Sequence, residues 1–169
     1  MPGKILDKAW RSWGSAPRQV GLHMQNILIV EDDLMIADMT EEFLVGSGYR
    51  VCGIARTVAA AVALGKIHHP DLALIDLRLA EGGFGADVAA ELQKSKRTGI
   101  LFASGNITQF DLTSDNGDGC LVKPYLTKDL LCSLTIISEI VATGSSSLPH
   151  PRGFRLLKPA DHNLKALHA

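Results

Sequence analysis

The central part of the chain alternates short apolar runs with longer stretches in which apolar residues recur at helical spacing. Short continuous apolar runs are typical of strands that are covered on both faces of a sheet. We predict five such strands, at residues 26–30, 49–54, 71–76, 99–103 and 120–122. Because helical patterns alternate with these runs, the sequence indicates a parallel sheet with helices on both faces.

The predicted fold is therefore an α/β, doubly wound, five-stranded parallel sheet with the flavodoxin-like strand order 2-1-3-4-5. Asp33, Thr57 and Thr127 stand where side chains that cap helix N-termini are expected. The stretch between the fourth and fifth strands is short and polar, so it predicts a short or irregular helix near residues 108–112.

The two ends of the chain differ from this central domain of residues 25–142. Residues 1–24 lack a long periodic pattern but hold both tryptophans, Trp10 and Trp13, so they form either a disordered extension or a docking arm. Residues 143–169 open with a Gly- and Ser-rich stretch and contain three prolines, a composition typical of a flexible tail. The alternative within this tail is a small docking segment at Phe154–Lys158.

Composition narrows the classes of function. The chain has 169 residues and a formal net charge of −1, which favours neither a nucleic-acid surface nor attraction to a membrane. No apolar run reaches the roughly 18 residues that a membrane helix needs. Its three cysteines form no Cys-x-x-Cys pair, so we expect reduced thiols and a cytoplasmic protein rather than a disulfide scaffold or a zinc site.

Polar residues follow four of the predicted strands at the point where each strand ends. Glu31 and Asp32 follow the first strand, Asp76 ends the third, Ser104 follows the fourth and Lys123 follows the fifth. Ligands of open α/β sheets bind outside the carboxyl ends of the strands, so these side chains are expected to gather at one edge. Asp33 is better explained as a helix cap than as a ligand.

This set of side chains suits phosphoryl transfer. Clustered carboxylates repel one another, and a Mg²⁺ ion relieves that repulsion while it also binds phosphate oxygens. Lys123 supplies a second positive charge, and Ser104 can donate a hydrogen bond to a phosphoryl oxygen. Asp76 is the expected nucleophile, because a carboxylate is ionised at neutral pH and needs no general base.

Four motifs in order resemble the receiver domains of bacterial two-component response regulators. They are Ile27–Asp33, Pro70–Asp76, Phe102–Gly105 and Leu121–Tyr125, and together the resemblance covers about residues 25–142. The Phe-Ala-Ser-Gly stretch is similar to a subgroup that has Phe-Ala-Thr-Gly-Tyr at this place and is common in alphaproteobacteria, where it often pairs with kinases of the HWE type. Asn106 replaces the tyrosine of that subgroup.

The resemblance implies a role for each residue. Asp76 would accept the phosphoryl group, Ser104 and Lys123 would contact it, and Gly105 would leave room for its approach. Glu31, Asp32, Asp76 and the backbone carbonyl of Arg78 would hold Mg²⁺. The side chains of Arg78 and Asn106 would tune dephosphorylation.

The expected function is that of a single-domain response regulator without turnover of an external substrate. Its partners would be a histidine kinase or phosphotransfer protein and an unknown downstream protein, with a homodimer as an open possibility and no nucleic acid or membrane. Many receivers carry an aromatic switch residue at the position of Cys120, so a degenerate receiver that binds partners without phosphorylation is the alternative. A phosphatase of the haloacid-dehalogenase type is disfavoured, because Arg78 stands where those enzymes place a second aspartate.

Overall fold

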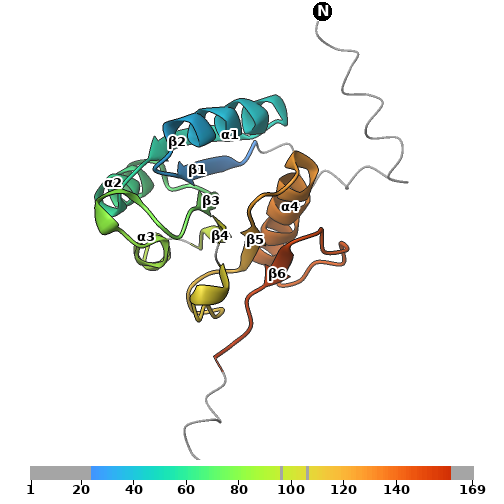
Figure 1. Ribbon diagram of the computed structural model, residues 1–169. Helices are drawn as coiled ribbons and strands as arrows, with labels where there is room; N and C mark the ends of the chain where they lie inside the picture. Colours follow the sequence, from blue (N-terminus) through green and yellow to red (C-terminus); the bar gives the residue numbers. More distant parts are fainter. Residues whose placement is uncertain (1–23, 96, 106, 161–169) are drawn as a thin grey trace, which may run out of the picture.

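A single mixed sheet runs through the molecule. The computed structural model describes residues 24–95, 97–105 and 107–160. The strands are β1 (Asn26–Val30), β2 (Arg50–Ala55), β3 (Leu72–Ile75), β4 (Gly99–Ser104), β5 (Gly119–Val122) and β6 (Phe154–Leu156). The order across the sheet is β2-β1-β3-β4-β5-β6 (Figure 1). The first five strands pair in parallel, which confirms the predicted order 2-1-3-4-5 and the α/β class.

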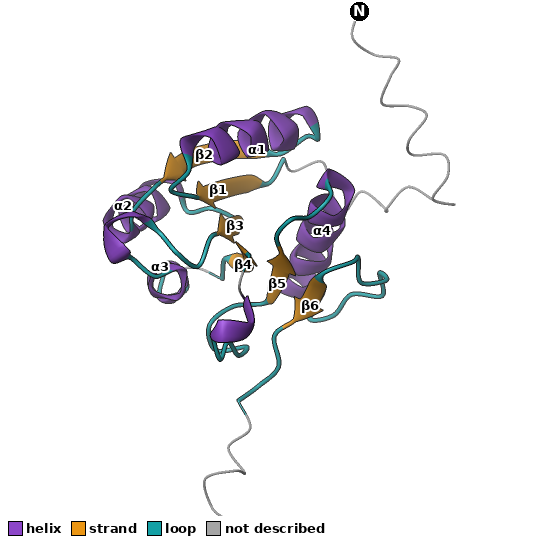
Figure 2. Ribbon diagram, in the orientation of Figure 1, coloured by secondary structure: helices purple, strands orange, loops and turns teal. Residues whose placement is uncertain are grey.

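Helices cover both faces of the sheet. The α-helices are α1 (Leu34–Gly46), α2 (Val58–His68), α3 (Gly85–Leu92) and α4 (Thr127–Thr143). Figure 2 shows α1 and α4 on one face and α2 and α3 on the other. One apolar cluster lies under α1 and α4, and a second lies under α2 and α3. Among the described residues, no helix combines the length and the apolar character that crossing a membrane requires.

Side chains cap two of the helices as predicted. Asp33 accepts hydrogen bonds from the backbone amides at the start of α1, and Thr57 accepts one from the amide of Ala60 in α2. The predicted cap at Thr127 is wrong. Leu126 has the extended backbone of an N-cap there, so Thr127 is already the first helical residue and α4 begins without a side-chain cap.

The connection between β4 and β5 contains one short 3₁₀ helix, η3 (Ile107–Gln109), in agreement with the predicted short or irregular helix. Ile107 is buried, and the half-buried Phe110 and Leu112 pack against the cluster under α2 and α3. The polar residues that follow form turns instead of a helix, so a loop covers this part of the sheet.

The sixth strand corrects the prediction of a five-stranded sheet and of a flexible tail at residues 143–169. Within that segment, β6 pairs antiparallel with β5, and Phe154 and Leu157 are buried. The Gly- and Ser-rich opening of the segment dominated its composition, whereas three paired residues leave almost no periodic signal. Residues 161–169, and all but the last residue of the predicted extension over residues 1–24, lie outside the described part of the chain.

Candidate functional site

Three carboxylates meet at the ends of β1 and β3. The amide of Glu31 donates to the carbonyl of Ala55 at 2.9 Å, and the amide of Asp76 donates to the carbonyl of Val30 at 2.8 Å. These bonds continue the parallel pairing by one residue beyond the strands, so the backbone fixes where the two side chains begin. Asp32 follows Glu31 directly. The predicted gathering of these residues at one edge of the sheet is what the structure has.

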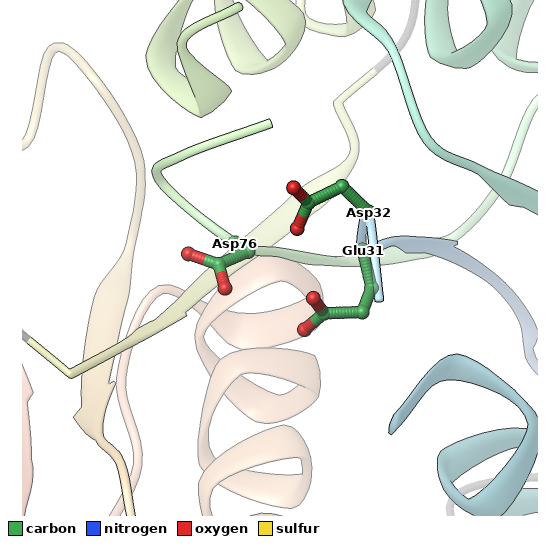
Figure 3. A group of neighbouring side chains, drawn as sticks. All are labelled: Glu31, Asp32 and Asp76. Carbon is green, nitrogen blue, oxygen red and sulfur yellow. The ribbon is translucent and has the colours of Figure 1, made fainter. Parts of the chain in front are cut away.

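The three side chains face a common space (Figure 3). One carboxylate oxygen from each of Glu31, Asp32 and Asp76 lies within 4.8 Å of the other two. Glu31 is buried, while Asp32 and Asp76 are partly exposed. The site is therefore open on the side of the two aspartates and closed on the side of the glutamate.

Lys123 reaches into the carboxylate cluster from the residue after β5. Its Nζ donates to Oε2 of Glu31 at 2.6 Å and to Oδ2 of Asp76 at 2.8 Å. The amide of Lys123 donates to the carbonyl of Ser104 at 3.0 Å, which anchors its backbone to the end of β4. The ammonium thus bridges the buried acid and the predicted acceptor.

Burial and ion pairing act against each other at this bridge. Burial raises the pKa of Glu31 above its ordinary value, although the hydrogen bond from Lys123 acts in the opposite direction. Burial alone would lower the pKa of Lys123, but its hydrogen bonds to Asp76 and Glu31 outweigh that effect and raise it. Lys123 therefore stays charged at neutral pH and supplies a fixed positive charge next to Asp76.

The remaining predicted residues that the structure describes follow β3 or stand at the end of β4. Ser104 is buried at the end of β4, and a Cβ atom added at Gly105 would meet nothing within 4 Å, so there is open space beside it. The amide of Arg78 donates to Oδ1 of Asp76 at 3.2 Å. The metal-binding role of the Arg78 carbonyl stays a prediction, and Asn106 lies outside the described residues.

Two further residues support the site and were missed from the sequence. A Cβ atom at Gly85 would lie 2.2 Å from the carbonyl oxygen of Asp76, so only glycine allows α3 to begin this close to Asp76. Gln109 in η3 accepts a hydrogen bond from Nη2 of Arg78 at 2.9 Å. The cluster of glycines at residues 82–85 marked a loop, but the sequence held no sign of which one touches Asp76.

The donor set fits a Mg²⁺ ion. Carboxylate oxygens are hard ligands, and magnesium sites in proteins commonly use one or two carboxylates together with water and phosphate oxygens. Three carboxylates and one ammonium carry a formal charge of −2, which a divalent cation would neutralise. Glu31, Asp32 and Asp76 are the residues that would hold the ion.

A comparison with protein families agrees with this geometry. The family model of the response regulator receiver domain matches residues 27–135. The chain belongs to this family. Residues 27–135 include β2, β3, β4 and β5 whole, β1 from its second residue on, and every residue of the acidic site, so membership covers the part of the chain that carries the chemistry.

Two characterised relatives are similar over this region. The phyllosphere-induced regulator PhyR of Methylorubrum extorquens is 33% identical over 102 residues, which are 59% of this chain and 38% of PhyR. The transcriptional regulatory protein PdtaR of Mycobacterium tuberculosis is 31% identical over 116 residues, which are 66% of this chain and 56% of PdtaR. This receiver chain therefore spans 38% and 56% of the two relatives' own lengths.

Solved structures give the same fold. The signal receiver domain of a modulated diguanylate cyclase from Desulfovibrio desulfuricans superposes with a TM-score of 0.66 and 26% identity, over 73% of this chain and 100% of that one. A CheY-like receiver domain protein from Methanospirillum hungatei superposes with a TM-score of 0.64 and 25% identity, over 73% of this chain and 100% of that one. The predicted receiver family and fold are thus confirmed.

Proposed function

We propose that this receiver chain accepts a phosphoryl group on Asp76 in a Mg²⁺-dependent reaction. The donor would be a histidine kinase or a phosphotransfer protein, and the result would be altered binding to a downstream protein. The observation that carries the proposal is the bridge from Lys123 to Glu31 and Asp76, which places a cation beside an ionisable, partly exposed acceptor. No turnover of an external substrate is expected.

The site residues would divide the work as follows. A carboxylate oxygen of Asp76 attacks phosphorus, the bond from phosphorus to the donor nitrogen breaks, and its electron pair leaves with the donor imidazole. Lys123 and the hydroxyl of Ser104 would then contact the phosphoryl oxygens. When bound, Mg²⁺ would neutralise charge on the phosphoryl group. Because the reacting groups are held by strand ends, positioning and charge neutralisation would supply most of the catalysis.

Helix α1 offers a surface for the protein donor beside the acidic site. Met35 and Met39 are 74% and 67% exposed, and they lie four residues apart on one face of the helix. Leu34, 52% exposed, begins the same helix directly after the acidic stretch. Exposed apolar groups next to a reactive centre favour a protein partner, since burial of such groups drives association.

The acceptor itself can be tested with a small donor. Acetyl phosphate and Mg²⁺ should add one phosphoryl group to the wild-type chain, measured by intact mass, and Lys123→Ala should lower the rate at least tenfold. Glu31→Gln and Asp32→Asn should raise the Mg²⁺ concentration needed for half-maximal phosphorylation. Uptake that does not depend on Mg²⁺ would contradict the proposed metal site.

The docking surface can be tested separately. Met35→Glu combined with Met39→Glu should slow phosphotransfer from a phosphorylated kinase or phosphotransfer protein and leave uptake from acetyl phosphate unchanged. Ile67→Glu is the matched control, because Ile67 is 69% exposed but lies on α2, which covers the opposite face of the sheet. Equal transfer to the α1 variant and to the control would exclude α1 as the docking surface.

The alternative of a degenerate receiver has a distinct outcome. If the chain binds its partners without phosphorylation, the wild type and Asp76→Asn should bind them equally when a phosphoryl donor is supplied. If the proposed function is right, the donor should change binding by the wild type, while Asp76→Asn should still bind as the unphosphorylated wild type does.

A further inference from the structure

A segment after α4 runs along the outer edge of β5. We call residues 148–158 the C-terminal strap. Its strand β6 pairs antiparallel with β5, with Cys120 opposite Arg155 and Leu121 opposite Phe154. The amide of Val122 donates to the carbonyl of Gly153, and the amide of Leu157 donates to the carbonyl of Asp118, both at 3.0 Å. The edge of β5 is therefore occupied by the chain's own backbone.

Side chains of the strap complete the core at this end of the sheet. Phe154 is 8% exposed and packs on Gly119, where an added Cβ atom would lie 2.8 Å from the ring. It belongs to the cluster under α1 and α4, whereas Leu157, also 8% exposed, joins the cluster on the opposite face. Removal of the strap would thus expose apolar groups of both faces along β5.

The strap also covers a thiol. Cys120 lies in the middle of β5 with no exposed surface, and its Sγ accepts a hydrogen bond from Nε of Arg155 at 3.0 Å. Burial raises the pKa of this thiol above its ordinary value, so the covered group is a poor nucleophile. The reactivity of Cys120 therefore reports on a cover that the strap forms together with η3 and the loop after it.

The strap is joined to the acidic site through the backbone. Val122, which binds Gly153 of the strap, directly precedes Lys123, and the amide of Lys123 donates to the carbonyl of Ser104. A second connection runs through the loop after β4, because the amide of Ser114 donates to the carbonyl of Lys158 at 2.9 Å. A shift of Lys123 or Ser104 toward a phosphoryl group would act on both of these hydrogen bonds to the strap, the one that joins Val122 to Gly153 and the one that joins Ser114 to Lys158.

The strap has the properties of an element that can be released. Its strand has three residues, and the Gly- and Ser-rich residues 144–147 separate it from α4. Short peripheral elements with few buried side chains open at a lower free energy than the rest of a domain. An uncovered strand edge, in turn, binds extended segments by strand addition.

We propose that phosphorylation of Asp76 loosens the C-terminal strap and uncovers the edge of β5, where a downstream protein adds an extended segment whose aromatic side chain fills the place of Phe154. This inference rests on the proposed function, because phosphorylation is the event that it requires. It assigns the signal to the β5 edge, where Arg155 and Cys120 meet.

Labelling of Cys120 tests the inference. The full chain with Cys52→Ala and Cys132→Ala keeps Cys120 as its one cysteine. N-Ethylmaleimide is added with Mg²⁺, in the presence or absence of acetyl phosphate, and intact mass follows the maleimide and the phosphoryl group in the same sample. Phosphorylation should accelerate labelling about tenfold, because a shift in a minor open state changes the reactive fraction by such factors. Asp76→Asn should show no acceleration.

Two variants of the strap test whether the strap is the element that shields Cys120 from the maleimide. Phe154→Ala should label rapidly with or without acetyl phosphate, while Arg152→Ala, an exposed position of the same strap, should behave as the parent does. Slow labelling of Phe154→Ala would overturn the inference, as would a phosphorylated parent whose labelling rate is unchanged. Absence of the phosphoryl group on the parent would instead show that the proposed function fails, and the inference with it.

Discussion

The two faces of the sheet are completed in different ways. On one face, α1 with 13 residues and α4 with 17 residues cover the strands. On the other, α2 and α3 with 11 and 8 residues cover one half, while η3, the loop after it and Leu157 of the strap cover the other half. A helix satisfies its backbone within itself, whereas a loop depends on contacts made elsewhere. The loop-covered half should therefore be the more easily opened part of the molecule.

The loop-covered half shows this dependence in its hydrogen bonds. The Asp118 carboxylate accepts from the amide of Ile100 at 2.8 Å and also pairs with the guanidinium of Arg97. The side chain of Asn116 accepts from the amide of Thr113 at 2.9 Å. Polar side chains thus bind backbone amides here, as the carbonyls of a helix do on the other face. Their removal should loosen the loop-covered half and leave the helix-covered face little changed.

The largest expected difference concerns leucine truncation. Leu134→Ala in α4 removes a fully buried side chain and should lower the free energy of unfolding by about 2–5 kcal/mol. Leu112→Ala removes a half-buried side chain from the loop-covered half and should cost about 1 kcal/mol, because the loop can close the space. Urea unfolding of both variants measures the difference. Equal losses would contradict the contrast between the two faces.

The next effect concerns the polar support of the loop. Asp118→Ala removes the acceptor for Ile100 and Arg97 and should lower the free energy of unfolding by about 1.5–3 kcal/mol, since hydrogen bonds to charged groups have that strength. Hydrogen exchange should show the loss as faster exchange at residues 113–118, with little change in α1. Ser114→Ala serves as a control, because Ser114 is exposed and its hydrogen bond to the strap uses the backbone amide.

The smallest expected effects concern the helix caps. Thr57→Ala removes the side-chain cap of α2 and should cost about 1 kcal/mol. Leu126→Ser supplies the cap that α4 lacks and should add about 0.5–1 kcal/mol to the free energy of unfolding. Both changes are measured by thermal or urea unfolding. A stabilising effect of Thr57→Ala, or a loss for Leu126→Ser, would show that these caps do not act as the backbone geometry indicates.

The acidic site could be predicted from the sequence because strand ends in a parallel sheet converge by topology alone. Once β1 and β3 are assigned, Glu31 and Asp76 must lie side by side, and the register of Val30 opposite Ile75 confirms it. The approach of Lys123 to Asp76 is predicted in the same way, because Lys123 directly follows β5 at the same edge of the sheet. The site thus needed only the correct strand order.

The strap could not be predicted, because its strand depends on contacts between residues far apart in the chain. Phe154 is held by Gly119 and by the apolar groups beneath it, and neither contact leaves a local pattern around residue 154. The role of Gly85 was hidden for a similar reason, since the close approach to the Asp76 carbonyl is a property of the folded backbone. Tertiary contacts determine both features, and the local sequence around each residue does not indicate them.

Identification of the residue that carries the phosphoryl group tests the central claim most directly. After treatment with acetyl phosphate and Mg²⁺, the chain should gain about 80 Da, the mass of one phosphoryl group. Reduction with borohydride should then convert the phosphorylated aspartate to homoserine, and tandem mass spectrometry should find homoserine at residue 76. Homoserine at Asp32 or at another aspartate, while residue 76 stays aspartate, would contradict the assignment of Asp76 as the acceptor.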